Sequence, residues 1–223
     1  MTAWVALAVS VFAAVLSAFI TLRQVRLKSE LDLEAQRAQT LAKYREPLAA
    51  AAFDLQSRLY NILRLNFFGN WGATRGDDAE LTTLFRIAQY FGWTELLRRD
   101  IQFLAFPEDE DTRRVATLQF RIAKCFLHDD YDEAAMMIWN DEQRAIGERM
   151  IIEEHGMVLC MGYARFRDEV DRIYAGSLAR IRAQVHDAAA HKRFRDIQHL
   201  LCELVEALDE RRMRYTPDNL ELA

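Results

Sequence analysis

Hydrophobic and polar positions divide the chain into one uninterrupted apolar stretch and a long amphipathic remainder. Residues 2–22, TAWVALAVSVFAAVLSAFITL, contain no charged side chain. A helix rises about 1.5 Å per residue, so this stretch is long enough to cross the roughly 30 Å hydrocarbon core of a bilayer. The pattern predicts a transmembrane helix over residues 1–22.

Charges beside this stretch predict its orientation. Arg23, Arg26 and Lys28 follow it with no acidic residue among them, and cationic residues mark the cytoplasmic side. A cleaved signal peptide needs basic residues before the apolar stretch, and residues 1–4 contain none; no small-residue cleavage site follows either. We therefore expect a retained single-pass anchor, with the N-terminus outside and the C-terminal domain in the cytoplasm.

Small residues gather on one side of the predicted membrane helix when successive positions are placed at 100° steps. This candidate packing or pore face consists of Ala6, Ser10, Ala13, Ala14, Ser17 and Thr21. Small side chains let two membrane helices approach closely, which indicates self-association. A plain anchor and a pore lining remain open as well, although serine and threonine hydroxyls can bond to their own helix and do not require water.

Residues 23–46 are polar, free of glycine and proline, and rich in helix-forming residues. They predict a helical stalk that continues the membrane helix. A 4-3 spacing joins Leu27, Leu31, Ala38, Leu41 and Leu48, which is typical of a short coiled-coil seam. An amphipathic helix packed on its own domain explains the spacing equally well. Pro47 predicts a boundary or kink.

Residues 47–215 carry repeated 3.6-residue patterns and predict a bundle of about seven to nine helices when the stalk is included. Two of these patterns predict buried faces: Val115, Leu118, Ile122 and Phe126, and Ile197, Leu200, Leu201, Leu204 and Leu208. The glycines of GNWGATRGDD predict a loop over residues 69–78. Gly92 predicts the end of one helix, and Gly156 the end of another. No stretch alternates as a strand would, and residues 216–223 are expected to form a tail.

Composition narrows the fold and the function. With only 8 glycines and 3 prolines in 223 residues, the chain has few turn formers, which favours an all-α fold over a sandwich or a doubly wound sheet. The net charge of −5 excludes a globally basic nucleic-acid binder. The three cysteines are far apart and odd in number, so we expect reduced thiols rather than a disulfide framework or a zinc site.

Candidate catalytic and metal-binding patterns are incomplete. Asp196 and His199 have the three-residue spacing of a carboxylate-bridged di-iron site, but no second pair exists, so a pair at the surface is expected. There is no G-x-S-x-G motif, and each cysteine lies in an apolar helical pattern. We therefore predict no catalytic residue, metal ligand or cofactor and favour a non-enzymatic protein, while an enzyme acting at the membrane with a pocket near Glu142 and Arg58 stays open.

One polar placement stands out in the helical pattern. Glu142 and Arg149 interrupt an otherwise apolar stripe in MIWNDEQRAIGERMII, and so need partners from another element. Arg58, Asn61 and Asn66 are the candidates. Such a network serves fold specificity in most proteins and marks a ligand pocket in others. Both interpretations remain open, with the structural one favoured.

Three segments, YREPLAAAAFDLQSRLYNIL, WNDEQRAIGERM and CMGYARF, resemble a group of bacterial, chiefly actinobacterial-type, proteins with one membrane helix and a helical cytoplasmic body. The resemblance implies a plasma-membrane location and no particular activity. Together with the small-residue face and the stalk, it leads us to expect a self-associating scaffold or adaptor that holds a cytoplasmic protein partner near the bilayer. The alternative is an oligomeric pore or channel gated by the cytoplasmic domain.

Overall fold

The computed structural model describes residues 2–75, 77–101, 110–128, 131, 134–173, 176–209, 214–215 and 220–223. The chain divides into two units, residues 1–40 and residues 41–223, and each is considered by itself. The predicted boundary between stalk and body, at residues 46–47, lies a few residues beyond this division.

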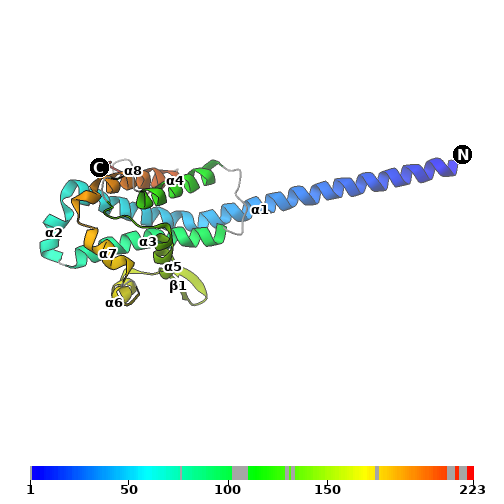
Figure 1. Ribbon diagram of the computed structural model, residues 1–223. Coiled ribbons are helices and arrows are strands. Elements are labelled where there is room, and N and C mark those ends of the chain that lie inside the picture. The colour runs from blue at the N-terminus through cyan, green and yellow to red at the C-terminus, as the bar shows by residue number, and fades with distance from the viewer. Residues whose placement is uncertain are drawn as a thin grey trace. The chain divides into compact units, whose positions relative to one another are not determined.

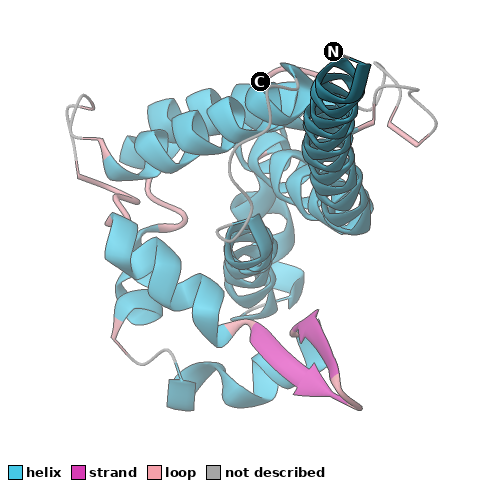
Figure 2. Ribbon diagram, turned by 90° about the vertical axis from the view of Figure 1, so that its right-hand side faces the viewer, coloured by secondary structure: helices cyan, strands magenta, loops and turns pink. Residues whose placement is uncertain are grey.

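Helices account for most of the described residues, which confirms the expected all-α class (Figure 1, Figure 2). In chain order the elements are α1 (Thr2–Leu65), α2 (Phe67–Arg75), α3 (Asp77–Ile101), α4 (Glu110–Leu127), α5 (Asn140–Arg149), β1 (Ile151–Glu154), β2 (Met157–Cys160), α6 (Tyr163–Ile173), α7 (Ser177–Gln184), the 3-10 helix η1 (Ala188–Ala190) and α8 (His191–Leu208).

The predicted transmembrane segment lies mostly outside the residues whose side chains are described, which exclude 1–15 and 18. Among the residues that the structure does describe, no helix combines the length and the apolar character needed to cross a membrane. The transmembrane helix therefore stays a prediction.

Pro47 lies inside α1 and does not end it. A proline in a helix interior costs about 3 kcal/mol because it removes one backbone hydrogen bond and crowds the preceding turn. Directly after it, Leu48, Leu55 and Leu59 are at most 1% exposed, and each buried leucine side chain contributes about 1.5–3 kcal/mol. Burial of this face outweighs the cost, so the helix continues to Leu65.

The chain turns sharply between α1 and α2 at Asn66, whose backbone is left-handed with φ 48°. Asparagine tolerates this conformation better than most residues. The Asn70 side chain then donates to the carbonyl oxygen of Leu65 at 2.7 Å, which satisfies a helix-end acceptor. Residues 69–75 therefore belong to α2, and the prediction of a loop there is wrong.

Glycine permits close packing within the body rather than breaking its helices. Gly92 lies in the interior of α3, so the predicted helix end at this residue is wrong. A Cβ atom on Gly92 would lie 2.7 Å from Cβ of Met150 and 2.8 Å from Sγ of Cys160. On α5, a Cβ atom on Gly147 would lie 2.6 Å from the carbonyl oxygen of Phe91. These two glycines let α5 and β2 approach α3 closely.

Residues 151–160 form an antiparallel hairpin instead of the end of a helix, which corrects the prediction for this segment. The strands pair from Ile151 opposite Cys160 to Glu154 opposite Met157. His155 and Gly156 join them with φ values of 53° and 75°, as a two-residue type I′ turn requires. Gly156 thus ends a strand, not a helix.

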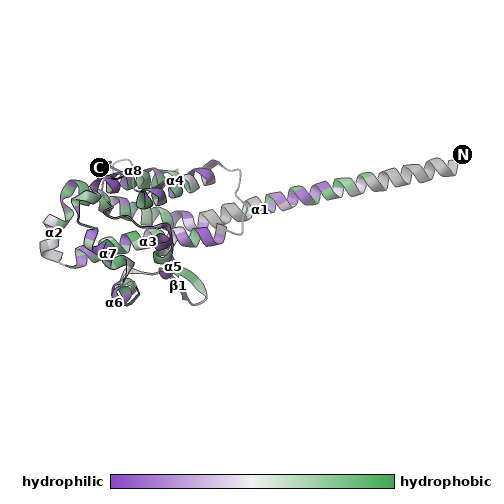
Figure 3. Cartoon of the chain, viewed as in Figure 1, coloured by the Kyte–Doolittle hydropathy of each residue, from purple (hydrophilic) through white to green (hydrophobic). Residues whose placement is uncertain are grey.

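The two amphipathic faces predicted for α4 and α8 are confirmed, and the two helices pack against each other (Figure 1). All nine of the residues predicted for these faces are at most 6% exposed. On α4 and α8, hydrophobic and hydrophilic residues lie on different sides (Figure 3). One aromatic contact, between Phe91 of α3 and Phe126 of α4 at 5.1 Å between ring centroids, joins this pair to α3.

Residues 220–223, predicted as part of a tail, pack on α8. The buried amide of Gln198 donates to the carbonyl oxygen of Glu221 at 2.8 Å and accepts from the backbone N–H of Ala223 at 3.2 Å. The same amide donates to Gln56 of α1 at 3.1 Å. A buried amide therefore joins α1, α8 and this segment, because its donor and acceptor would otherwise stay unsatisfied.

Candidate functional site

The candidate packing or pore face of α1 is described only in part. Ala6, Ser10, Ala13 and Ala14 lie outside the residues with described side chains, whereas Ser17 and Thr21 are exposed. The Thr21 hydroxyl donates to the carbonyl oxygen of Ser17 at 2.8 Å. This hydroxyl is thus satisfied by its own helix and needs no water beside it.

Arg58, the first candidate of the predicted polar network, is buried between α1, α2 and α3. Its guanidinium lies 3.8 Å from the ring centroid of Phe67. One of its nitrogens donates to Thr83 Oγ1 at 3.1 Å and to the carbonyl oxygen of Ala79 at 3.5 Å. Because a buried guanidinium needs both acceptors and a favourable π face, Arg58 fixes how these three helices meet.

The remaining candidates on α1 occupy different environments. Asn61 is half-buried, whereas Asn66 is exposed and forms the turn between α1 and α2. The helix α1 ends one residue before Asn66, so Asn66 is not part of that helix. Arg149 is exposed at the last turn of α5.

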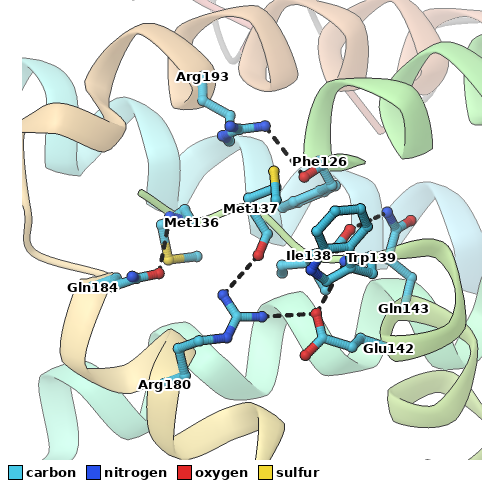
Figure 4. A network of polar contacts seen from close by, with 10 residues as sticks. All are labelled: Phe126, Met136, Met137, Ile138, Trp139, Glu142, Gln143, Arg180, Gln184 and Arg193. Carbon is cyan, nitrogen blue, oxygen red and sulfur yellow. Dashed lines mark hydrogen bonds and ion pairs between the residues drawn. The ribbon is translucent and has the colours of Figure 1, made fainter. Parts of the chain in front are cut away.

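Glu142 lies in the first turn of α5 and binds a residue that the sequence pattern did not indicate. Its Oε2 accepts the backbone N–H of Trp139 at 3.0 Å, which makes it part of the helix cap. The same oxygen lies 2.7 Å from Nη2 of Arg180 on α7 (Figure 4). Arg180 also donates to the carbonyl oxygen of Met137 at 2.8 Å. Glu142 and Arg58 therefore make their contacts with different elements.

The segment of residues 134–139, between α4 and α5, is held from several sides (Figure 4). Gln143 donates to the carbonyl oxygens of Ile138 at 2.8 Å and Ala123 at 3.0 Å. Gln184 of α7 accepts from the backbone N–H of Met136 at 3.2 Å. Met136 has a left-handed φ of 58°, which these contacts stabilise against its steric cost.

Arg193 of α8 is the most buried cation described, at 1% exposure. Its Nε donates to the carbonyl oxygen of Ala135 at 3.0 Å, and Nη1 donates to those of Cys125 at 2.5 Å and His128 at 3.0 Å. The guanidinium also lies 4.3 Å from the centroid of the Tyr131 ring. Burial lowers the pKa of Arg193 from its ordinary value.

Sequence reasoning missed Arg193 and Gln198, although a signal for both was present. Both lie on the apolar face of α8, and a polar residue on an apolar face is the same signal that drew attention to Glu142 in α5. Arg193 follows Lys192 and precedes Arg195 by two positions, so it resembles part of a solvated basic run.

Two surface grooves border α4. The first, of about 610 Å³, lies between α4 and α8, and its lining includes Cys125, Tyr131, Asp196, His199 and Glu203. The Tyr131 hydroxyl donates to Asp196 at 2.9 Å, and burial together with this bond raises the pKa of Tyr131. The acids of this groove are already bound, because Glu203 lies 3.4 Å from Arg121.

The second groove, of about 660 Å³, lies between α3, α4 and α5, and its lining includes Phe91, Glu95, Arg98, Phe120, Lys124 and Arg144. Glu95 is 4% exposed and accepts from Nε of Arg98 at 2.6 Å and Nε of Arg99 at 2.9 Å. Burial alone would raise the pKa of Glu95, but these hydrogen bonds and positive charges outweigh it and hold the pKa below its ordinary value.

Among the residues that the structure describes, no site for thiol or metal chemistry is assembled. Cys125, Cys160 and Cys202 are free thiols, and burial raises the pKa of each. Within the described ranges no three metal-ligating side chains come together. Asp196 and His199 do not form the expected pair: Asp196 binds Tyr131, and Nε2 of His199 lies 3.1 Å from the carbonyl oxygen of Ala223.

The arrangement of these groups is that of a rigid helical body with polar contacts directed mainly at its own backbone. No protein-family model, curated protein or solved structure matches this chain.

Proposed function

We propose that the protein is a membrane-tethered, self-associating helical scaffold or adaptor that holds a protein partner at the cytoplasmic face of a bacterial plasma membrane. Its uncharged segment over residues 2–22 would be the anchor. The helical body over residues 41–223 would then present its surface to the partner.

The observation that carries this proposal is the exposure of large apolar side chains along α1. Between residues 16 and 31, seven such side chains are 47–64% exposed in the single chain: Leu16, Phe19, Ile20, Leu22, Val25, Leu27 and Leu31. A run of this kind is unfavourable in water and favours burial in lipid or against another copy of the chain. It continues past the uncharged segment, which supports association of helices in addition to anchoring.

A pore lined by Ser10, Ser17 and Thr21 is the second candidate. The internal hydrogen bond from Thr21 to Ser17 gives it less support than the scaffold has, because a satisfied hydroxyl stripe does not call for water. Ion flux through liposomes that is lost on Ser10→Leu with Ser17→Leu would favour the pore over the scaffold.

Particle mass of the full chain in mild detergent or nanodiscs tests the scaffold. We expect a multiple of the 26.0 kDa chain mass. Ala14→Phe adds bulk to the small-residue face and should lower the mass, whereas Ala8→Phe adds the same bulk on the opposite face of the same helix and should leave the mass unchanged.

A chain beginning at Ser29 separates the two sources of association. Monomers after this truncation would place assembly in the anchor, and surviving oligomers would place it in the stalk or body. A full chain that is monomeric in every condition would contradict self-association and leave a tethered binding domain.

A further inference from the structure

The groove between α3, α4 and α5 combines an exposed aromatic side chain with positively charged residues. Phe120 of α4 is 70% exposed, the highest value among the large hydrophobic residues of the described chain. Beside it, the groove wall includes Phe91, Ala123 and Leu127. Aromatic side chains, phenylalanine among them, are enriched in protein interfaces relative to the rest of the surface.

The rim of this groove carries cations without acidic partners. Within the described part of the chain, no ion pair involves Lys124 or Arg144, and both are exposed. The one acid in the lining, Glu95, is buried and already bound to Arg98 and Arg99. The groove therefore presents a net positive rim around an apolar wall, on a chain whose total charge is −5.

We propose that this groove is the docking site for an acidic amphipathic segment of the protein partner, with an apolar side chain placed against Phe120 and Leu127 and carboxylates placed beside Lys124 and Arg144. The inference rests on the proposed function and specifies that the partner contributes an acidic amphipathic segment. A ligand that covers Phe120 must extend out of the groove across α4, which suits a peptide better than a small enclosed ligand. Arginine and aromatic groups are the residues that carry most binding energy in such interfaces.

The probe is a fluorescein-labelled peptide of about four helical turns, with leucine at every third or fourth position and glutamate elsewhere. Binding is read by anisotropy on the full chain in mild detergent, whatever its particle mass. A peptide with lysine in place of each glutamate is the charge control. We expect the glutamate peptide to bind and the lysine peptide to bind at least about tenfold more weakly.

Two variants test the wall and the rim separately. The wall variant is Phe120→Ala, and the rim variant combines Lys124→Glu with Arg144→Glu. Each should raise the Kd of the glutamate peptide about tenfold. All three side chains are exposed, so the fold should be kept, which circular dichroism checks. The control for the wall variant is Met157→Ala, at an exposed apolar residue of the hairpin. The control for the rim variant is Arg114→Glu with Arg195→Glu, at two exposed cations that do not line the groove. Both controls should leave the Kd within about twofold.

Three results would overturn the proposal. The first is equal binding of the peptide by all variants. The second is displacement of the peptide by soluble short-chain phosphatidylserine, with lipid binding lost in the rim variant, and the third is a lower particle mass in Phe120→Ala. The second assigns the groove to lipid, and the third to another copy of this chain. Because the labelled peptide is much smaller than one 26.0 kDa chain, its anisotropy rises on binding to a monomer or to an oligomer. Failure here therefore leaves the mass experiment standing, and a monomeric chain leaves the groove testable.

Discussion

Arg193 stabilises the body through backbone acceptors rather than through a carboxylate. Its guanidinium binds carbonyl oxygens from the last turn of α4, from His128 and from Ala135, and packs against Tyr131. Hydrogen bonds from a charged donor contribute about 1.5–3 kcal/mol, and an unsatisfied buried acceptor costs a similar amount. The planar fork of arginine reaches several acceptors at once, which a lysine cannot do.

Replacing this side chain should therefore be costly. We expect Arg193→Met, which keeps most of the volume, to lower the free energy of unfolding by about 2–4 kcal/mol, because the carbonyl oxygens lose their donor. Arg195→Met, an exposed position on the same helix, is the control and should change it by less than about 0.5 kcal/mol. Urea unfolding followed by circular dichroism measures both, and equal stability of the two variants would show that the acceptors find water instead.

At the scale of elements, close approach between α3 and α5 depends on a glycine. The Cβ position of Gly147 meets a backbone carbonyl oxygen of α3 at 2.6 Å and Cβ of Glu95 at 3.0 Å. A backbone atom cannot move aside as a flexible side chain would, so the helices themselves must separate to admit a methyl group.

We expect Gly147→Ala to destabilise the body by about 1–3 kcal/mol, the usual cost of overpacking. Gly72→Ala in α2 is a matched control, since no atom lies within 4 Å of its Cβ position. There the better helix propensity of alanine should stabilise the protein by up to about 1 kcal/mol. If this account is correct, the thermal unfolding midpoint falls for Gly147→Ala and rises for Gly72→Ala. Shifts of the same sign in both variants would refute it.

Hydrophobic periodicity predicts some features of this fold and not others. Apolar spacing located α4 and α8 and their buried faces, because burial on one side of a helix leaves a direct trace in the sequence. It failed at Asn66, Gly92 and the hairpin turn at His155 and Gly156, where backbone conformation or close contact decides. The partners of Arg58, Glu142 and Arg193 were also out of reach, since backbone carbonyl oxygens and residues far along the chain leave no trace in local spacing.

At the scale of the molecule, the two units have different kinds of surface. The buried apolar side chains of the body form one cluster from Tyr44 to Leu220, whereas Leu27 and Leu31 of α1 are 51% and 64% exposed. Stability of the body should therefore not depend on these two leucines, while self-association should.

We expect Leu27→Glu with Leu31→Glu to lower the particle mass of the full chain and to leave the unfolding midpoint of the body unchanged. The seam pairs like positions across helices, so carboxylates placed there repel each other. Ser29→Glu with Gln36→Glu adds the same charge at positions off the seam and should leave the mass as it is. A fall in the unfolding midpoint on the leucine substitutions alone would show that these residues support the body directly.

The carbonyl contacts of Arg193 also set an order of events during synthesis. They join residues 58 to 68 positions apart in the chain, and the arginine is the later of the two in every case. A ribosome adds about 5–20 residues per second, so the segment after α4 waits roughly 3 to 14 seconds before its donor is made. Throughout that interval the apolar face of α4 has no α8 to cover it, which makes the nascent chain at this stage a natural substrate for a chaperone.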